Sequence, residues 1–265
     1  MQQFEGKVAL VTGGSSGIGH AAARLFAQRG ARVVIAARGV ERGEEATHEI
    51  VEAGGEAVFV QADVGRAADV EHLVAQTVEI YGRLDFGFNN AAVARGAFAL
   101  TADFDADEYD EVMGVNLKGV WLCMKHEIRQ MLAQDPAGGA IVNTSSVNGL
   151  GGAQQGALYS ASKAGVLALT KSAAQEYALQ GIRVNALVAG AFRTPMLEGV
   201  IQKAAGGDPE KAAAAEAQYA GMVPLRRIGK PEEAAEAALW LCSDAASYVT
   251  GHSMIVDGGW TAPMR

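Results

Sequence analysis

Two residue types that transfer protons stand four positions apart in the sequence. Tyr159 and Lys163 fall within residues 158–178, where apolar side chains recur with a helical period. Positions i and i+4 share a helix face, so the Lys163 ammonium can approach the Tyr159 phenol. A charge about 6 Å away at an effective dielectric constant of ~20 contributes about 2.8 kcal/mol, which would lower the phenol pKa by about two units. The pair predicts an acid–base tyrosine, although a surface pair on an amphipathic helix would have the same spacing.

Serine and asparagine side chains are further candidates for this chemistry. Ser145 and Ser146 follow the apolar run 140–144, at the carboxyl end where ligands of open α/β sheets bind. A serine hydroxyl there could hold a carbonyl oxygen, or it could cap a turn, which is the commoner role. Asn116 interrupts an apolar helical stretch, where it either serves a site or bonds its own helix backbone.

A glycine-rich turn near the N-terminus has the composition of a phosphate-binding loop. Gly13, Gly17 and Gly19 follow the apolar run 8–12 and open a helical segment, with the spacing G-x-x-x-G-x-G. Missing side chains let the backbone approach a pyrophosphate, and a helix N-terminus offers free N–H groups and a positive dipole end. Tight packing alone could also select glycine, but the position at the first strand–helix junction favours a dinucleotide site.

The end of the second apolar run bears on the choice of cofactor. An NAD site would place Asp or Glu there to accept from the adenosine ribose 2′-hydroxyl, whereas this chain has Ala37 followed by Arg38. A guanidinium can pair with a 2′-phosphate through two hydrogen bonds, although Arg38 could also be a solvated surface charge. The sequence therefore favours NADP(H) and leaves NAD(H) possible.

Alternating strands and helices must position these residues. Near-continuous apolar runs that alternate with helices indicate a parallel sheet covered on both faces, so we predict an α/β fold with one doubly wound Rossmann-type domain over residues 1–265. About seven strands are expected, at residues 8–12, 32–37, 57–61, 84–89, 140–144, 183–188 and 253–256. Helices are expected at residues 18–29, 40–53, 68–81, 108–131, 158–178 and 232–241.

One stretch breaks this alternation. Residues 189–223 are rich in Ala, Gly and Gln and contain Pro195 and Pro209. An insertion of this length in a compact domain is more often functional than idle, so we predict that it forms a substrate loop or lid.

The order of these motifs resembles the classical short-chain dehydrogenase/reductase (SDR) family from about Lys7 to Gly259. The turn at 12–19 resembles the family's T-G-x-x-x-G-x-G motif, and residues 89–92 are similar to its N-N-A-G motif, with Ala92 in place of Gly. A second departure is Ala189, where the family usually has proline before Gly190. The family's catalytic tetrad corresponds to Asn116, Ser146, Tyr159 and Lys163.

The resemblance implies a mechanism and a cofactor site. Tyr159 would exchange a proton with the oxygen of the carbonyl or alcohol, Ser146 would hold that oxygen, Lys163 would lower the tyrosine pKa and bind the nicotinamide ribose, and Asn116 would hold a water that connects Lys163 to solvent. Together with the motifs above, it implies these cofactor contacts: Gly13, Ser15, Ser16, Gly17, Ile18, Gly19, Arg38, Asp63, Val64, Asn90, Ala91, Tyr159, Lys163, Gly190 and Thr194.

The substrate remains open at this point. Residues close to the motifs are mixed apolar and amide side chains without a cationic cluster, and we expect them to line the pocket: Ser146, Val147, Asn148, Gln154, Met196, Leu197 and Met222. A ketone or secondary alcohol is the leading interpretation. Alternatives are a 3-oxoacyl carrier-protein thioester, for which Arg129, Arg226 and Arg227 would form a docking patch, and a non-catalytic nucleotide-binding protein on the same scaffold.

Composition excludes several other classes of function. The net charge of −8, without a Lys/Arg cluster, argues against a nucleic-acid partner. No histidines lie three or four residues apart, so no metal site is expected. No apolar stretch is long enough to span a bilayer, and no export signal is visible, so we expect a cytoplasmic protein with Cys123 and Cys242 reduced. Helical segments with weakly charged outer faces, together with the family resemblance, suggest a homotetramer.

Overall fold

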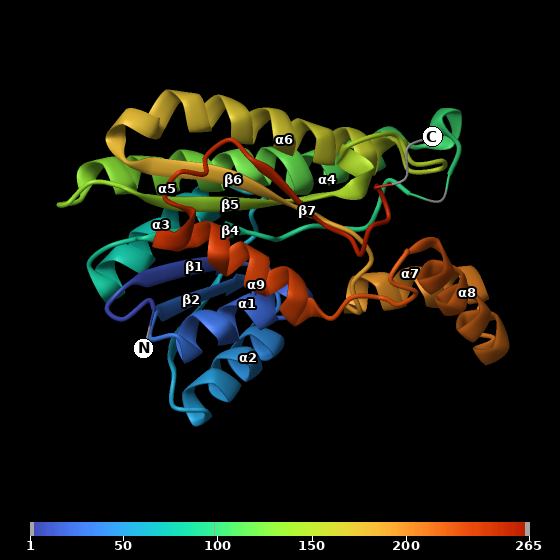
Figure 1. Ribbon diagram of the computed structural model, residues 1–265, viewed down its shortest axis with the longest axis horizontal. Coiled ribbons are helices and arrows are strands. Elements are labelled where there is room, and N and C mark those ends of the chain that lie inside the picture. Colours follow the sequence, from blue (N-terminus) through green and yellow to red (C-terminus); the bar gives the residue numbers. More distant parts are fainter. Residues whose placement is uncertain (1–2, 98, 263–265) are drawn as a thin grey trace.

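The computed structural model describes residues 3–97 and 99–262. Parallel strands form one seven-stranded sheet with helices on both faces, which confirms the predicted fold class (Figure 1). The strands are β1 (Val8–Thr12), β2 (Arg32–Ala37), β3 (Glu56–Gln61), β4 (Phe86–Asn89), β5 (Gly139–Ser146), β6 (Ile182–Ala189) and β7 (Ser253–Val256). The helices are α1 (Gly17–Gln28), α2 (Val40–Glu52), α3 (Ala67–Tyr81), α4 (Ala106–Met113), α5 (Val120–Ala133), α6 (Ala157–Tyr177), α7 (Pro195–Ala205), α8 (Pro209–Met222) and α9 (Pro231–Cys242).

The order of the strands creates a crevice at one edge of the sheet. The order is β3-β2-β1-β4-β5-β6-β7, so the direction of winding reverses between β1 and β4. Ligands of doubly wound sheets bind beyond the carboxyl ends of the strands at this reversal. There the Thr12 hydroxyl accepts hydrogen bonds from the backbone N–H groups of Asn90 (3.1 Å) and Ala91 (3.3 Å), which joins the ends of β1 and β4.

Apolar side chains fill both faces of the sheet, as the near-continuous hydrophobic strands predict. On the face covered by α1 and α9, Phe4, Phe26 and Phe86 form a cluster with ring centroids 5.1–5.8 Å apart. On the face covered by α3, α5 and α6, the core includes Leu73 and Met131. Each fully buried side chain of this size contributes roughly 1.5–3 kcal/mol to folding.

The helix expected at residues 108–131 is present, but its hydrogen-bonding pattern changes in the middle. A π-helical turn, Gly114–Gly119, separates α4 from α5. Inside this turn the Asn116 amide accepts from the Val93 N–H (2.8 Å) and donates to the Val93 carbonyl (3.0 Å). The predicted helix is therefore confirmed, since the backbone stays helical from Ala106 to Ala133, but it contains a π-helical turn that the sequence analysis did not foresee.

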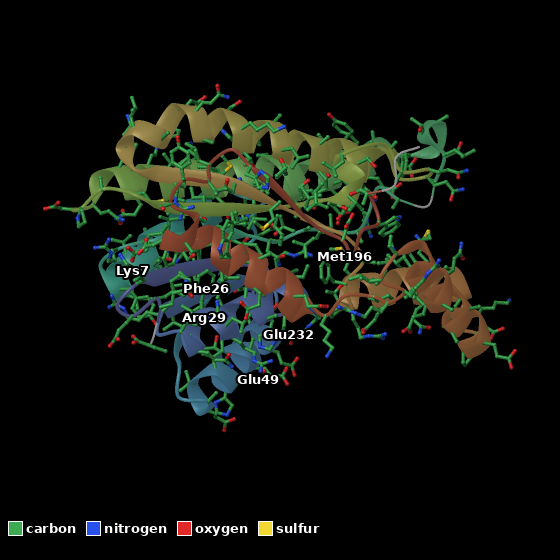
Figure 2. All side chains as sticks on the ribbon, in the orientation of Figure 1. Lys7, Phe26, Arg29, Glu49, Met196 and Glu232 are labelled. Atoms are coloured by element: carbon green, nitrogen blue, oxygen red, sulfur yellow. The ribbon has the colours of Figure 1, made fainter. Side chains whose placement is uncertain are left out.

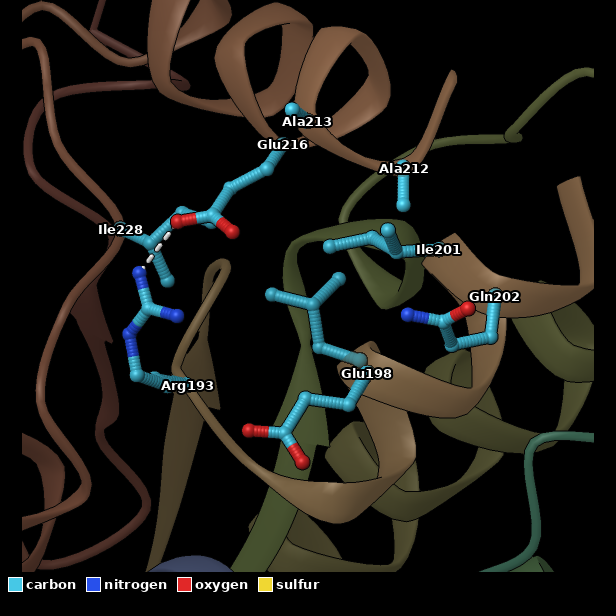
Figure 3. A pocket seen from close by; sticks show the side chains of 9 residues that line it. Arg193, Glu198, Ile201, Gln202, Ala212, Ala213, Glu216 and Ile228 are labelled. Carbon is cyan, nitrogen blue, oxygen red and sulfur yellow. Dashed lines mark hydrogen bonds and ion pairs between the residues drawn. The ribbon is translucent and has the colours of Figure 1, made fainter. Parts of the chain in front are cut away.

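Residues 189–223 form the helices α7 and α8, which stand outside the two helical layers (Figure 1). Thr194 and Asp208 are their N-caps, each followed by proline at the first helical position. Arg193 pairs with Glu216 of α8, beside a cavity of about 210 Å³ between the two helices (Figure 3). The segment is thus a helix pair tied to the chain that leaves β6.

Candidate active site

A cleft of about 500 Å³ opens at the crevice between the strand ends and the α7–α8 pair. Met196, at the start of α7, lies where this helix pair meets the rest of the molecule (Figure 2). Among the described residues that line the cleft, Lys163 is the only charged one. The cleft therefore suits a ligand that is largely uncharged where it contacts side chains.

Tyr159 and Lys163 lie on the first turns of α6, on the side of the helix that lines the cleft. The Lys163 Nζ is 5.7 Å from the centre of the Tyr159 ring and donates to the backbone carbonyl of Thr144 (2.9 Å). Ser146 is the last residue of β5, and its hydroxyl lies close enough to the Tyr159 phenol to act on the pKa of that group. The Ser146 Oγ also accepts from the Asn148 N–H (3.2 Å), which fixes the hydroxyl at the strand end.

The pKa of Tyr159 is shifted in the direction opposite to the sequence-based expectation. Burial raises the pKa of Tyr159 from 10.0 to about 12, and the Ser146 hydroxyl offsets only part of this. Burial also lowers the pKa of Lys163 to about 8, because the ammonium loses solvation. The expected lowering of the phenol pKa toward neutrality is therefore wrong for the protein alone, in which desolvation is the larger effect. The phenol is therefore protonated at neutral pH.

The glycine turn leaves room for a phosphate group. Gly13 has φ +66°, and a Cβ there would lie 2.9 Å from the Ala91 Cα. A Cβ at Gly19 would lie 2.3 Å from the Gly13 carbonyl oxygen, so the turn can close onto α1 only without side chains. Ser16, the N-cap of α1, makes no side-chain capping hydrogen bond. The cradle and the uncapped helix N-terminus fit the pyrophosphate of a dinucleotide.

The adenosine end of the expected cofactor site lies beyond the cleft. Arg38 directly follows β2 and is exposed, and the described residues offer its guanidinium no ion pair. Asp63 lies two residues after β3, where its carboxylate accepts from the Gly65 N–H (2.9 Å). Because β2 and β3 pair up to Ala37 and Gln61, Arg38 and Asp63 leave the sheet at the same edge.

The structure gathers most of the predicted site residues in the cleft. Of the expected cofactor contacts, the following line it: Gly13, Ser16, Gly17, Ile18, Asn90, Ala91, Tyr159, Lys163, Gly190 and Thr194. All the expected substrate contacts also line it: Ser146, Val147, Asn148, Gln154, Met196, Leu197 and Met222. Five expected residues do not line it: Ser15, Gly19, Arg38, Asp63 and Val64. Asn116 is buried away from the cleft, with its side chain bonded to Val93.

Several cleft residues escaped the sequence analysis. Tyr219 of α8 and Trp260, which follows β7, both line the cleft. Gln155 also lines it and has φ +59°, a conformation that non-glycine residues rarely adopt outside functional sites and tight turns. A signal was present for Tyr219, which is the only aromatic residue in an alanine-rich helix.

A buried polar network lies in the core next to this site. The Asn89 amide at the end of β4 donates to Glu127 of α5 (2.9 Å) and to Asn143 of β5 (3.0 Å), and Asn143 donates to Thr170 of α6 (3.0 Å). Glu127 is fully buried, and burial raises its pKa to about 7. One Glu127 oxygen and the Asn89 carbonyl oxygen have no hydrogen-bond partner in the part of the chain described.

The described residues contain neither a metal-binding cluster nor a membrane-spanning helix. Among residues 3–97 and 99–262, no cluster of three His, Cys, Asp or Glu side chains is placed to hold a metal ion. Within the same ranges, no helix combines the length and hydrophobicity that a membrane span requires.

The sequence and the fold both match characterised proteins. Residues 13–261 match a family described as "Enoyl-(Acyl carrier protein) reductase". The chain is 41% identical over 263 residues to a 2,5-dichloro-2,5-cyclohexadiene-1,4-diol dehydrogenase of Sphingobium indicum, a match that covers 99% of this chain and 100% of the relative.

Two solved structures superpose closely on this one. Levodione reductase gives a TM-score of 0.93 at 36% identity, covering 98% of this chain and 100% of that one. An NAD+-bound xylitol dehydrogenase gives a TM-score of 0.90 at 34% identity, covering 97% of this chain and 100% of that one. The similarity therefore extends over the whole fold.

Proposed function

The chain belongs to the short-chain dehydrogenase/reductase family, and on that premise we propose that it interconverts a ketone and a secondary alcohol with NADP(H). Members of this family use nicotinamide cofactors. The observation that carries the proposal is the meeting of Tyr159, Ser146 and Lys163 at one end of a cleft whose other end is the glycine cradle. The relatives reported above are named dehydrogenases and reductases, in agreement with this reaction type.

The residues of the cleft divide the chemistry among them. When bound, the cofactor supplies or accepts the hydride. Ser146 and Tyr159 hold the substrate oxygen between their hydroxyls, and Tyr159 donates a proton to it in reduction or accepts one in oxidation. Lys163 is held by the Thr144 carbonyl, so its ammonium stays near the phenol and stabilises the phenolate that forms when the proton leaves. The shape of the cleft would orient the substrate carbon toward the proton-transfer residues.

Asn116 would contribute by holding the π-helical turn in place and not by contacting the substrate. Its side-chain amide accepts a hydrogen bond from the Val93 N–H and donates one to the Val93 carbonyl. These two bonds tie the π-helical turn to the chain that follows β4. A water between Asn116 and Lys163, if it relays protons to solvent, would be held by the backbone of this turn rather than by the amide.

The direct test is turnover with a ketone panel. Purified protein is mixed with NADPH and alicyclic, aliphatic and thioester ketones, and loss of NADPH absorbance is followed; NADP+ with secondary alcohols tests the reverse direction. Turnover of an uncharged ketone supports the proposal. Binding of NADPH without turnover of any substrate would identify a nucleotide-binding protein instead. The thioester alternative is less favoured, because Arg227 of the expected docking patch is paired with Glu233.

Arg38 provides the test of cofactor preference. An exposed guanidinium without an ion pair among the described residues can bind the 2′-phosphate through charge-assisted hydrogen bonds, which contribute roughly 1.5–3 kcal/mol. We expect Arg38→Ala to raise the KM for NADPH about 10–100-fold and to leave the KM for NADH unchanged. Arg129→Ala, which removes an exposed arginine of α5, is the control. A wild-type protein that uses NADH as efficiently as NADPH would contradict the preference.

We also propose a homotetramer. Residues of α4, the π-helical turn, α5 and α6, most of them apolar or small, surround an open groove that also contains Asp110 and Lys118. In this groove Trp121 is 46% exposed, beside Leu117 and Leu169. Sedimentation should give a mass about four times the 27.5 kDa of one chain. Trp121→Glu should yield smaller species, because a buried charge opposes association. A wild-type monomer at micromolar concentration would refute the proposal.

A further inference from the structure

Two aromatic side chains from distant parts of the chain meet in the substrate part of the cleft. Tyr219 lies on α8 and Trp260 follows β7, and both line the cleft. Their ring centroids are 6.4 Å apart and the rings are nearly perpendicular, at 85°. Edge-to-face pairs of this kind are favourable contacts that hold both rings in place. The pair, called here the aromatic wall, therefore has a defined shape.

A compact turn fixes Trp260. The Asp257 carboxylate accepts from the Gly259 N–H (2.8 Å), the Thr261 N–H (2.8 Å) and the Thr261 hydroxyl (2.7 Å). The donors are the residues immediately before and after Trp260, so the three hydrogen bonds fix the backbone that carries its indole. Gly190 packs directly on Asp257, since a Cβ at Gly190 would lie 2.7 Å from the Asp257 Cα. The turn is thus anchored to the end of β6, beside the catalytic residues.

The same turn holds the end of α8. The Leu225 N–H donates to the Gly258 carbonyl (3.2 Å), and a Cβ at Gly258 would lie 2.5 Å from a methyl group of Val223. Val223 is the C-cap of α8 and is buried. Because the C-terminal turn and the end of α8 form one packed unit, Trp260 and Tyr219 keep their relative positions.

The side chains around the aromatic wall indicate which kind of ligand it would contact. Met196, Leu197, Val200 and Met222 supply apolar surface beside the aromatic wall. Among the described cleft residues, only Lys163 carries a charge, and it donates to the Thr144 carbonyl next to the proton-transfer site. A charged group on the substrate would therefore lose its hydration without gaining a partner.

We propose that Tyr219 and Trp260 determine specificity by selecting substrates whose carbinol or carbonyl carbon lies in an uncharged hydrocarbon ring. The inference rests on the proposed ketone–alcohol chemistry and names its substrate class. A ring presents a rigid apolar face to the aromatic wall. An open chain with the same number of carbons loses internal rotations when it binds, so it gains less from the same contacts.

The test compares cyclohexanone with 2-hexanone, two uncharged six-carbon ketones, by kcat/KM with NADPH. The wild-type protein should prefer cyclohexanone by about tenfold or more. Trp260→Ala and Tyr219→Ala should each lower kcat/KM for cyclohexanone about tenfold, mainly through KM, and change the value for 2-hexanone by less than about threefold. Trp260→Phe should retain most of the preference. The anionic 4-oxocyclohexanecarboxylate should react about tenfold more slowly than cyclohexanone.

The controls separate this inference from the proposed function. Tyr248→Ala, which removes a fully exposed aromatic side chain that does not line the cleft, should leave both values unchanged. Equal losses for both ketones in the Trp260 and Tyr219 variants, or no ring preference in the wild type, would overturn the inference while the enzyme remains active. If no ketone or alcohol turns over, the proposed function fails, and ring selection is then judged by ligand-observed NMR with cyclohexanol and 2-hexanol. A binding preference for the ring that Trp260→Ala removes supports the aromatic wall; equal binding overturns it.

Discussion

Tyr159→Phe is expected to lower kcat for ketone reduction by about 10²–10⁴-fold, the range that a positioned general acid contributes. The substitution removes only the phenol oxygen, and the ring can keep its place beside the Lys163 ammonium, 5.7 Å from its centre. The KM for NADPH should change little, because the glycine cradle and Arg38 are untouched. Single-turnover and steady-state rates at saturating cofactor measure the effect.

Two comparisons keep this prediction specific. Tyr248→Phe removes a hydroxyl that is fully exposed and should have wild-type kinetics. Equilibrium binding of NADPH and the unfolding midpoint of Tyr159→Phe should match those of the wild type, which separates lost chemistry from lost folding. Full turnover by a folded Tyr159→Phe protein would refute the role of this residue.

The pH dependence follows from the two shifted groups of the same site. Burial raises the pKa of Tyr159 to about 12 and lowers that of Lys163 to about 8. The phenol therefore stays protonated at neutral pH, as reduction requires, while the Lys163 ammonium is lost above about pH 8. Reduction should slow as the pH rises through 8, and oxidation, which needs the phenolate, should speed up with pH.

Glu127→Gln is expected to stabilise the protein at pH 8 by about 3 kcal/mol relative to the wild type and to leave stability near pH 4 almost unchanged. Burial raises the pKa of Glu127 from 4.5 to about 7, so the folded state binds more protons than the unfolded state between these values. Stability that a protonated Glu127 provides is thus complete below pH 4.5 and is lost as the pH rises through 7, at about 1.4 kcal/mol per pH unit.

The geometry of the network supports an amide at this position. The Asn89 carbonyl oxygen has no partner among the described residues, and a glutamine side chain could donate to it while still accepting from the Asn89 amide nitrogen. Urea unfolding of both proteins at equal concentration, at pH 4 and pH 8, gives the difference. Glu44→Gln, at an exposed site on α2, should show no such pH-dependent gain. A Glu127→Gln protein that is less stable than the wild type by the same amount at both pH values would show that Glu127 does not titrate in this range.

The parts of the fold that the sequence predicted depend on short-range patterns. The apolar runs gave all seven strands, because a parallel sheet covered on both faces buries its strands almost continuously. The ends of the observed strands differ from the predicted ones by at most two residues. One of these differences matters for the site, since β5 extends to Ser146 and places that hydroxyl at the edge of the sheet. The glycine turn and the Tyr159–Lys163 spacing were also readable, since each is a contact within one or two turns of chain.

Contacts between distant segments could not be read in this way. The π-helical turn at Gly114–Gly119 lies inside the predicted helix, and its Asn116 side chain is bonded to Val93; the helical pattern of the sequence gives no sign of either. The segment of α7 and α8 was predicted only as a substrate loop or lid, whereas the structure places Pro195 and Pro209 at the first positions of two helices. In both places a local pattern had more than one solution, and tertiary packing selected one.

The sequence alone determined the doubly wound fold and the SDR motifs and supplied the candidate proton-transfer residues, because these depend on residue types at fixed spacing. Only the tertiary structure decided the electrostatic state of Tyr159 and Glu127, since burial depends on what packs around a side chain rather than on its neighbours in sequence. It also brought Tyr219 to Trp260, 41 positions apart in the chain, because two separate turns must pack on one another to form that wall.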